Sequence, residues 1–446
     1  MEREKNFTQG NILRSLLLFA LPVLLALFLQ AMYGAVDLLI VGKFAASADV
    51  SAVSTGSQIM MTLTYLVSSF AMGTTILLGQ QIGCGEREQG GRTVGTAIIM
   101  FAGIAVLMTL LLVPLAPQVC SVMNAPREAF AQTIAYVRIC GGGMVVIVAY
   151  NLIGCIFRGI GDSRTPLLTV AIACVCNIAG DLILCAGFNM GTKGAAIATV
   201  LAQVISVIVS LLFIRRKKLP FDMKRSDLRI HLPSMKRMAG LGAPIALQDL
   251  LVSISFLIIL AIVNAMGVVA SAGVGVAEKV CAFIMLISSA FMQSISAFVA
   301  QNYGAGLMDR AKKALHYGVS VSFVIGVGMF CLTFFHGDIL AAIFSPDPEV
   351  IAAAADYLKA YAIDCLFTAI FFCYTGFYNG IGRTTFVMAQ GIIGALGVRV
   401  PISYLMSLRP NATLFQIGLA TPASSLVQLA LCLGYMLWLK RKEKAG

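Results

Sequence analysis

The chain has 446 residues, of which 59% are apolar and only 12% are charged, and its mean hydropathy is +0.91. A formal net charge of +12 would suit a nucleic-acid binder, but the basic residues gather in the short connections between apolar segments. These values lie far outside the range of a soluble globular domain and predict a protein that crosses a membrane many times, with no nucleic-acid partner.

Apolar runs that are long enough to cross a bilayer recur along almost the whole chain; a helix needs roughly 20 residues for this. The runs lack the alternation of a membrane β-barrel, so they predict α-helices. We expect an all-α polytopic membrane protein with twelve transmembrane helices. The expected spans are 12–40, 52–79, 93–117, 130–157, 166–186, 193–214, 238–265, 272–298, 314–336, 351–377, 385–406 and 416–438.

The loops predict the orientation of the chain. The N-terminal stretch MEREKNFTQGNILR leads straight into the first span and does not fit a cleaved signal peptide. The outer loops would hold only Lys43, Arg127, Lys193 and Arg409. The other side would hold Arg3, Lys5, Arg14, Arg87, Arg92, Arg158, Arg164, Arg310, Lys312, Lys313, Arg383 and the tail KRKEK. The positive-inside rule therefore predicts a plasma or inner membrane protein with both termini in the cytoplasm.

A single long polar connection divides the chain. It covers residues 215–237 and separates an N-terminal six-helix lobe, residues 1–214, from a C-terminal six-helix lobe, residues 238–446. Similar motifs recur about 220 residues apart, which indicates an internal duplication. Because six is an even number of crossings, both lobes enter the membrane from the same side and are expected to be parallel repeats around a central cleft.

Three pairs of motifs carry the evidence for duplication. A proline lies in the first helix of each lobe, at Pro22 and Pro244. The second helix ends in QQIGCG in one lobe and QNYGAG in the other, and the fourth ends in FRGIGDSRT or YNGIGRTT. Each pair alone is weak, but three pairs in the same order at the same spacing favour a duplicated fold.

Ionisable residues inside a span are costly, by about 2.5–3.5 kcal/mol on insertion scales, so each one is a candidate functional residue. Asp37 lies about one turn from the outer end of the first helix. In the fifth helix Asn177 and Asp181 are four residues apart and share a face, and Thr199 lies in the outer half of the sixth. These four side chains are predicted at one depth and could form one site.

The repeat, the two Q-x-x-G-x-G ends, the R-G-x-G-D sequence after the fourth helix and the order Gln30, Tyr33, Asp37 together resemble the MATE (multidrug and toxic compound extrusion) family of the MOP flippase superfamily. The resemblance covers nearly the whole chain. It implies a transporter rather than an enzyme. It also implies that Asp37, Asn177, Asp181 and Thr199 form a cation-coupling site, and that Gln30, Tyr33 and Asn151 line the substrate cavity.

Either of two cations would compensate a buried pair of aspartates. Two carboxylates in one low-dielectric pocket cannot both ionise easily, so one would hold a proton, or a Na⁺ would bind to carboxylate, amide and hydroxyl oxygens. Plainer readings remain open at this stage. Asp37 could be a helix-end carboxylate that reaches outer water, and Asn177 with Asp181 could be an interhelical hydrogen-bonded pair.

The C-terminal half holds three further carboxylates, Asp249, Glu278 and Asp364, which are candidates for a second cation site. Glu278 also suits a plain interfacial position. Arg399 could be the counter-ion of Asp364 or could line the cleft. In another branch of the MATE family, coupling depends on a glutamate and an aspartate at positions that align with Val252 and Thr368 here, so that mechanism is doubtful for this chain.

The leading functional hypothesis is a H⁺- or Na⁺-coupled antiporter that exports organic, mostly cationic amphipathic compounds by alternating access. A flippase for a lipid-linked saccharide is the alternative, and a membrane-embedded enzyme is a remote one, since no H-E-x-x-H or G-x-S-x-G motif occurs. Twelve cysteines without C-x-x-C pairs predict neither a zinc site nor disulfides. We expect no cofactor, no metal besides Na⁺ and a monomer in the lipid bilayer. Pro22 is predicted to let the first helix bend.

Overall fold

The computed structural model describes residues 7–216, 219–221 and 223–445, so Arg3, Lys5 and a few positions of the 215–237 connection lie outside the described residues. Within these ranges the chain is helical and contains no strand. Eleven helices are long and apolar enough to cross a membrane, or twelve if one bent pair is counted as a single span. The predicted all-α polytopic membrane fold is therefore confirmed.

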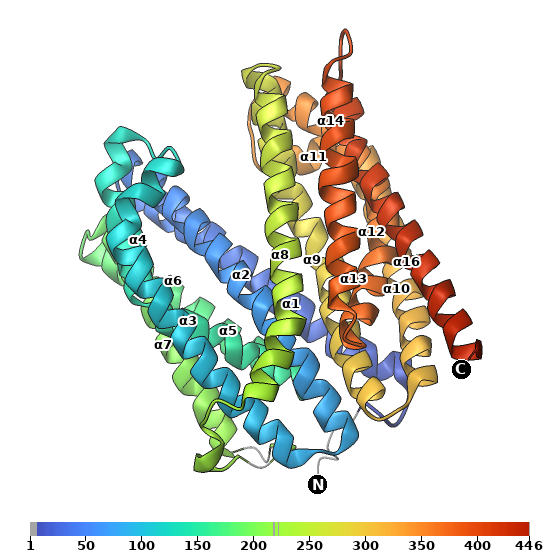
Figure 1. The fold of residues 1–446 in the computed structure, drawn as a ribbon. Coiled ribbons are helices and arrows are strands. Elements are labelled where there is room, and N and C mark those ends of the chain that lie inside the picture. Colours follow the sequence, from blue (N-terminus) through green and yellow to red (C-terminus); the bar gives the residue numbers. More distant parts are fainter. Residues whose placement is uncertain (1–6, 217–218, 222, 446) are drawn as a thin grey trace. The chain divides into compact units, whose positions relative to one another are not determined.

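The helices follow one another with short connections (Figure 1). In the first half they are α1 Ile12–Phe44, α2 Ser47–Cys84, α3 Arg87–Val122, η1 Arg127–Ala129, α4 Phe130–Gly142, α5 Met144–Gly159, α6 Arg164–Asp181, η2 Leu182–Gly187, α7 Gly191–Arg216 and η3 Arg225–Asp227. In the second half they are α8 Leu232–Asn264, α9 Val268–Gly304, α10 Met308–Phe335, α11 Gly337–Ala342, α12 Pro348–Gly380, α13 Thr384–Ile392, η4 Ile393–Arg399, α14 Val400–Ser407, α15 Leu414–Gly418 and α16 Ala420–Ala445.

The predicted fourth span is two helices rather than one. The segments Arg127–Gly142 and Met144–Gly159 meet at a bend of 56°. Gly143 stands at the break, where a Cβ atom would lie 2.7 Å from both methyl groups of Val200 on α7. Only a glycine leaves room here for the Val200 side chain, and a glycine interrupts a helix more readily than any other residue except proline.

The backbone supports the duplication. Gly85 and Gly306, which close the two Q-x-x-G-x-G motifs, have positive φ values of 76° and 73°. Gly161 and Gly382, in the loops after α5 and α12, have φ values of 83° and 79°. The left-handed conformation is typical of a glycine just beyond a helix, so matching glycines end matching helices in the two halves.

Contact clustering divides the chain into two compact units, each described separately here. Unit 1 comprises Met1–Thr8, Leu21–Ala243 and Gly304–Gly306; unit 2 comprises Gln9–Ala20, Pro244–Tyr303 and Leu307–Gly446. Helices α1 and α8 therefore change unit along their length, and α9 does so at its last residue, Gly304. The change falls beside Pro22 in α1 and at Pro244 in α8. The predicted lobes put the first turns of α1 in the N-terminal half and did not put those of α8 there. In the structure the first turns of α1 belong to unit 2 and those of α8 belong to unit 1.

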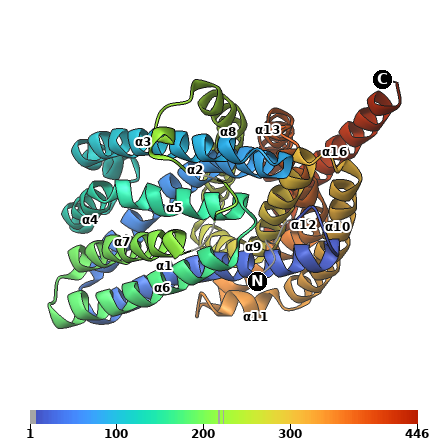
Figure 2. The ribbon, with the colours of Figure 1, turned by 90° about the horizontal axis from the view of Figure 1, so that it is seen from below.

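Unit 1 packs α2, α3, α4, α5 and α7 around one apolar core, and α6 runs beside α7 (Figure 2). The first turns of α8 belong to this unit. Thr74 Oγ1 of α2 donates a hydrogen bond to Met238 Sδ at 3.5 Å, and His231 Nδ1 lies 2.9 Å from Ser234 Oγ beside α3. The connection before α8 is thereby fixed against the cytoplasmic ends predicted for α2 and α3.

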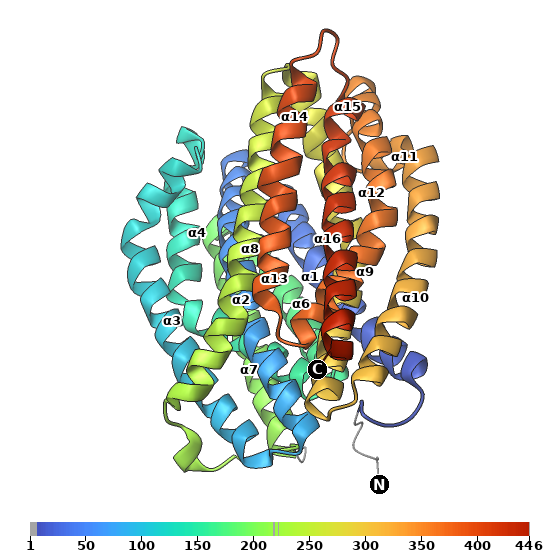
Figure 3. The same cartoon turned by 45° about the vertical axis from the view of Figure 1, so that its right-hand side comes forward.

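Unit 2 packs around α12, which runs beside α10 and α16 (Figure 3). Its apolar core joins residues of α8, α9, α11, α12 and α15. The beginning of α1 belongs to this unit as well. Arg310 of α10 donates two hydrogen bonds of 2.8 Å, from Nη1 to Gly10 O and from Nη2 to Gln9 O.

Candidate functional site

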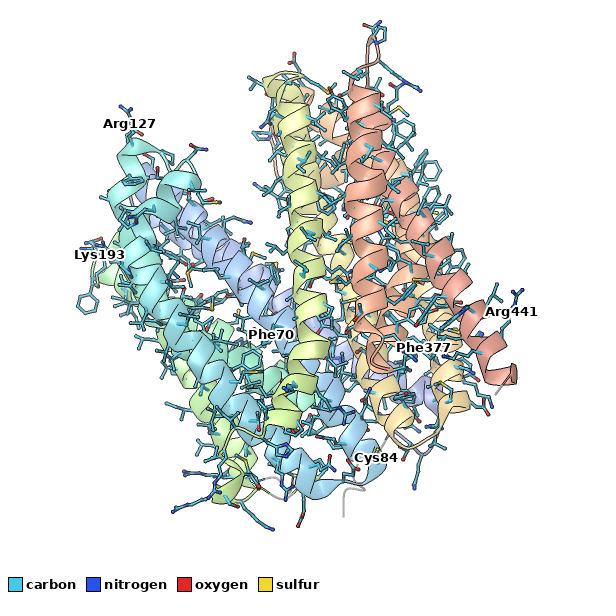
Figure 4. All side chains as sticks on the ribbon, viewed as in Figure 1. Phe70, Cys84, Arg127, Lys193, Phe377 and Arg441 are labelled. Carbon is cyan, nitrogen blue, oxygen red and sulfur yellow. The ribbon has the colours of Figure 1, made fainter. Side chains whose placement is uncertain are left out.

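The depth of the predicted site in unit 1 can be followed from the helix ends. Arg127 and Lys193 lie at one end of this unit and Cys84 lies at the other (Figure 4). Asp37 is seven residues before the end of α1 at Phe44, or about 10 Å along the helix. Asp181 is the last residue of α6, and Thr199 lies near the beginning of α7. All three therefore lie toward the end that carries Arg127 and Lys193.

The four predicted coupling residues lie together and are buried. Asp37 is 2% exposed, Asn177 and Asp181 are fully buried and Thr199 is 9% exposed. The Asp37 carboxylate lies within hydrogen-bonding reach of the Asn177 and Asp181 side chains. Helix α1 and the consecutive helices α6 and α7 thus bring two carboxylates, an amide and a hydroxyl into one place within unit 1.

Many polar atoms of this cluster form no hydrogen bond of good geometry, although Asp37 lies within reach of Asn177 and Asp181, and Tyr33 within reach of Thr199. The atoms without such a bond are Tyr33 Oη, Asp37 Oδ1, both amide atoms of Asn177, both carboxylate oxygens of Asp181 and Thr199 Oγ1. A buried polar group without a partner costs about 1–3 kcal/mol, and more if it is charged. So many unpaired acceptors at one point indicate that a cation or a shared proton belongs among them.

The donor set suits a proton or a hard monovalent cation better than a transition metal. The oxygens come from two carboxylates, one amide and one hydroxyl, and hard oxygen ligands favour alkali and alkaline-earth ions. Among the residues that the structure describes, no group of three or more His, Cys, Asp or Glu side chains could hold a metal ion. The site therefore attracts a cation mainly through the negative charge of Asp37 and Asp181.

Of the three predicted cavity residues, Tyr33 belongs to the cluster, Gln30 of α1 lies against α5, and Asn151 is a residue of α5. Tyr33 interacts electrostatically with Asp37 and Asp181 and also lies near Thr199. Gln30 donates from Nε2 to Tyr150 Oη at 3.4 Å. Asn151 accepts a hydrogen bond of 2.8 Å from Ser68 Oγ and donates from Nδ2 to Ile147 O at 2.8 Å.

Two residues of the cluster were not found by sequence reasoning. Tyr136 and Cys140 are buried on α4, and both interact with Asp37. Their spacing of four residues puts them on one helix face, but an uncharged tyrosine in an apolar span carries little signal. Tyr150 and Ser68 escaped notice for the same reason.

The three carboxylates of unit 2 are in different surroundings. Asp249 is exposed on α8, and Glu278 is half-buried on α9 with an unpaired Oε1. Asp364 is 2% exposed on α12, where its Oδ2 accepts a hydrogen bond of 2.8 Å from Thr368 Oγ1. It interacts electrostatically with Arg399, so Asp364 already faces a positive charge.

A short π-helical segment adjoins the buried charge in each unit. In unit 1, η2 (Leu182–Gly187) follows Asp181 directly. In unit 2, η4 (Ile393–Arg399) ends at Arg399. A π turn inside an α-helix is uncommon and frequently occurs at functional sites. The two segments do not occupy equivalent places in the repeat: at the spacing of Pro22 and Pro244, Arg399 corresponds to Asn177 and Asp181 corresponds to Ser403.

Comparison with known proteins adds independent evidence. The protein-family model described as MatE matches residues 22–183 and 244–405, one copy in each half of the chain. The probable multidrug resistance protein YoeA of Bacillus subtilis is 25% identical over 444 residues, which cover 98% of this chain and 96% of that protein. The probable multidrug resistance protein NorM of Thermotoga maritima is 23% identical, with 92% and 88% covered.

Solved structures agree on the fold. The outward-facing conformation of a multidrug resistance MATE family transporter of the MOP superfamily superposes with a TM-score of 0.92 at 19% identity, covering 100% of this chain and 99% of that one. A crystal structure of MATE in complex with MaL6 gives a TM-score of 0.90, also at 19% identity and with 100% and 99% covered.

Proposed function

Since this chain belongs to the MatE family, whose members are transporters and not enzymes, we propose that it exports multiple drugs in exchange for a coupling cation. The coupling cation is H⁺ or Na⁺, and the substrates are organic, mostly cationic amphipathic compounds. The support comes from the chain's curated relatives, which are named multidrug resistance or export proteins. Both termini are proposed to be cytoplasmic and the protein to act as a monomer in the plasma membrane.

One observation carries the proposal: the buried pair Asp37 and Asp181 with its unpaired oxygens. A pair of carboxylates in a low-dielectric interior needs a positive charge. A cation from outside and a cationic substrate from inside would compete for that charge, so binding of one would discourage binding of the other. Such competition is a coupling free energy between the two ligands, and it drives exchange when each ligand is released on its own side.

Each residue of the proposed site has a distinct role. Asp37 and Asp181 hold the charge, and Asn177 and Thr199 supply neutral oxygens that complete the surroundings of the cation. Tyr33 places a hydroxyl beside the same carboxylates. Pro22 lies in α1, fifteen residues before Asp37, and removes one backbone hydrogen bond of that helix. A change in the charge at Asp37 could thereby be transmitted into a bend of α1.

Efflux of a fluorescent cation tests the proposal. Vesicles or cells that contain the protein would be loaded with ethidium, and efflux would be followed under an imposed Na⁺ gradient, an imposed H⁺ gradient or neither. We expect Asp37→Asn and Asp181→Asn each to abolish gradient-driven efflux, because a neutral amide cannot bind the coupling cation. Asp338→Asn, at an exposed position on α11, serves as the control and should export normally.

The gradients distinguish the two coupling ions, because only the gradient of the true coupling ion should accelerate efflux. If both aspartate variants are made in normal amounts and export at the parental rate, the coupling site in unit 1 is wrong.

A further inference from the structure

The connection that precedes α8 contains a segment of unusual composition, residues 223–237 with the sequence MKRSDLRIHLPSMKR. Four large apolar side chains of this segment are between 41% and 57% exposed: Met223, Leu228, Ile230 and Leu232. Five exposed basic residues are interspersed with them, against one acidic residue: Lys224, Arg225, Arg229, Lys236 and Arg237. A loop in water gains nothing from exposed apolar side chains, so their presence beside positive charge indicates that the segment has a partner.

The backbone of the 223–237 segment is held against α3 of unit 1. Thr96 Oγ1 of α3 lies 3.2 Å from Arg229 O and accepts a hydrogen bond of 3.1 Å from His231 N. One residue earlier on α3, a Cβ on Gly95 would overlap with the carbonyl group of Asp227, so a glycine is needed for this close approach. Because the backbone is bound while the side chains stay exposed, the segment offers a surface whose shape is set before any partner binds.

The exposure pattern of α3 puts the segment at the edge of the membrane. Arg92 of α3 is exposed and charged, and residues 93–97 are buried where the segment crosses them. Ile98 follows directly and is exposed, as is Leu107 farther along the helix. Exposed apolar residues on a membrane-spanning helix face lipid. The boundary lies toward the end of unit 1 that carries Cys84, which is predicted to be cytoplasmic (Figure 4). The segment therefore lies at the height where phospholipid headgroups meet the protein.

We propose that the 223–237 segment binds anionic phospholipid headgroups of the membrane leaflet beside it. Its basic side chains bind the phosphates, and its four apolar side chains enter the boundary between headgroups and acyl chains. Among the described residues, Lys224 alone of the five basic residues forms an ion pair, with Glu88 at 3.7 Å, so four remain for phosphate groups. An acidic protein or a nucleic acid would match the charges but would leave Leu228 and Ile230 without an apolar partner. A neutral lipid would match only the apolar side chains.

A tryptophan reporter in the full-length protein tests the proposal. Trp438 is the only tryptophan of the chain, so Trp438→Phe gives a silent background and Ile230→Trp places a reporter in the segment. The purified protein is reconstituted into bilayers of phosphatidylglycerol and phosphatidylcholine in which one of the two lipids is brominated, because bromine quenches tryptophan fluorescence on contact. We expect both lipids to quench the reporter, and phosphatidylglycerol to bind on the order of tenfold more tightly than phosphatidylcholine at low salt.

Removal of charge assigns the preference to the basic residues. With Arg225→Gln and Arg229→Gln together, the preference for phosphatidylglycerol should fall severalfold, while quenching persists because the apolar side chains remain. Arg127→Gln with Lys193→Gln, at exposed positions at the other end of unit 1, is the matched control and should keep the parental preference. High salt should lower the preference in the parent as well, because screened charges attract headgroups less, and this measurement does not depend on the folding of any charge variant.

A second reporter, Leu107→Trp on the lipid-facing part of α3, should be quenched by the two lipids alike. The inference is overturned if Ile230→Trp is quenched by neither lipid, because the segment then faces water or another macromolecule. It is also overturned if the two lipids bind equally well beside Ile230→Trp, or if the preference survives both high salt and the loss of Arg225 and Arg229. The measurement uses no gradient and no exported compound, so cation-driven ethidium efflux can succeed or fail independently.

Discussion

At the scale of single residues, the structure explains why an aspartate can stand in the apolar stretch QAMYGAVDLLIVG. Asp37 is buried, and Asn177 and Asp181, which interact with its carboxylate, both come from another helix, α6. The sequence indicated this grouping because charged and amide side chains stand out in an apolar span. It did not reveal Tyr136, Cys140 or Tyr150, because their identity alone does not separate a site residue from a packing residue.

Thr199 provides a residue-scale prediction. Its Oγ1 is buried beside the carboxylates, close to the hydroxyl groups of Tyr33 and Tyr136, and forms no hydrogen bond of good geometry. Thr199→Val keeps the volume and removes the oxygen, so the concentration of coupling cation that gives half-maximal efflux should rise on the order of tenfold. Thr199→Ser keeps the hydroxyl and should stay close to the parent. A valine variant that shows the parental cation dependence would remove Thr199 from the site.

At the scale of elements, the chain's apolar runs located the spans well, and the irregularities inside them were missed. The break at Gly143 and the π turns of η2 and η4 lie within runs whose composition predicts continuous helices. Each irregularity depends on tertiary packing: Gly143 is in contact with Val200, and η4 lies against α16. Local composition carries no information about such contacts.

Pro22 carries a prediction for α1. The helix runs unbroken from Ile12 to Phe44, with Pro22 inside it and without one backbone hydrogen bond at that point. Pro22→Ala restores the donor and stiffens the helix, so we expect cation efflux to fall several-fold while the amount of inserted protein stays normal. Pro114→Ala, also at a proline inside a helix of unit 1, is the matched control. Unchanged efflux in Pro22→Ala would remove the bending hypothesis.

The ends of α5 and α12 carry a packing prediction. A Cβ on Gly159 would lie 3.0 Å from Thr75 O on α2, and one on Gly380 would lie 2.7 Å from Val299 Cβ on α9. Gly380→Ala should therefore lower stability by about 1–3 kcal/mol, and Gly159→Ala by less. Gly328→Ala on α10 meets open space and should be neutral or stabilising by about 0.5–1 kcal/mol. Melting temperatures in detergent would test this order.

At the scale of the whole molecule, the sequence reveals the duplication. It does not reveal that the beginning of α1 packs in unit 2 and the beginning of α8 in unit 1, which we call the exchange of helix ends. Repeated motifs at constant spacing reveal a repeat without any knowledge of contacts. The exchange depends on Arg310 binding the backbone of Gln9 and Gly10, and on Met238 packing beside Thr74. Both interactions join parts of the chain that are distant in sequence, and no local pattern marks them.

The exchange of helix ends between the units predicts how the protein behaves when it is made as two separate pieces. If the protein is made as two pieces, 1–222 and 223–446, each piece lacks the segment that completes its own unit. We expect each piece alone to be degraded or to aggregate, and the two expressed together to restore ethidium efflux. Arg310→Ala should weaken this restoration, because the α1 end then loses two hydrogen bonds. Stable, well-folded single pieces would contradict the prediction.

The contact between Arg310 and the backbone of Gln9 and Gly10 also constrains biosynthesis. The beginning of α1 leaves the ribosome first, but its partner helix α10 is translated roughly three hundred residues later. During that interval the first turns of α1 lack their final neighbours, including Ile295 and Gly318, which pack close to Leu16. The first turns of α1 are thus translated long before α10 but gain these contacts only after α10 has been made.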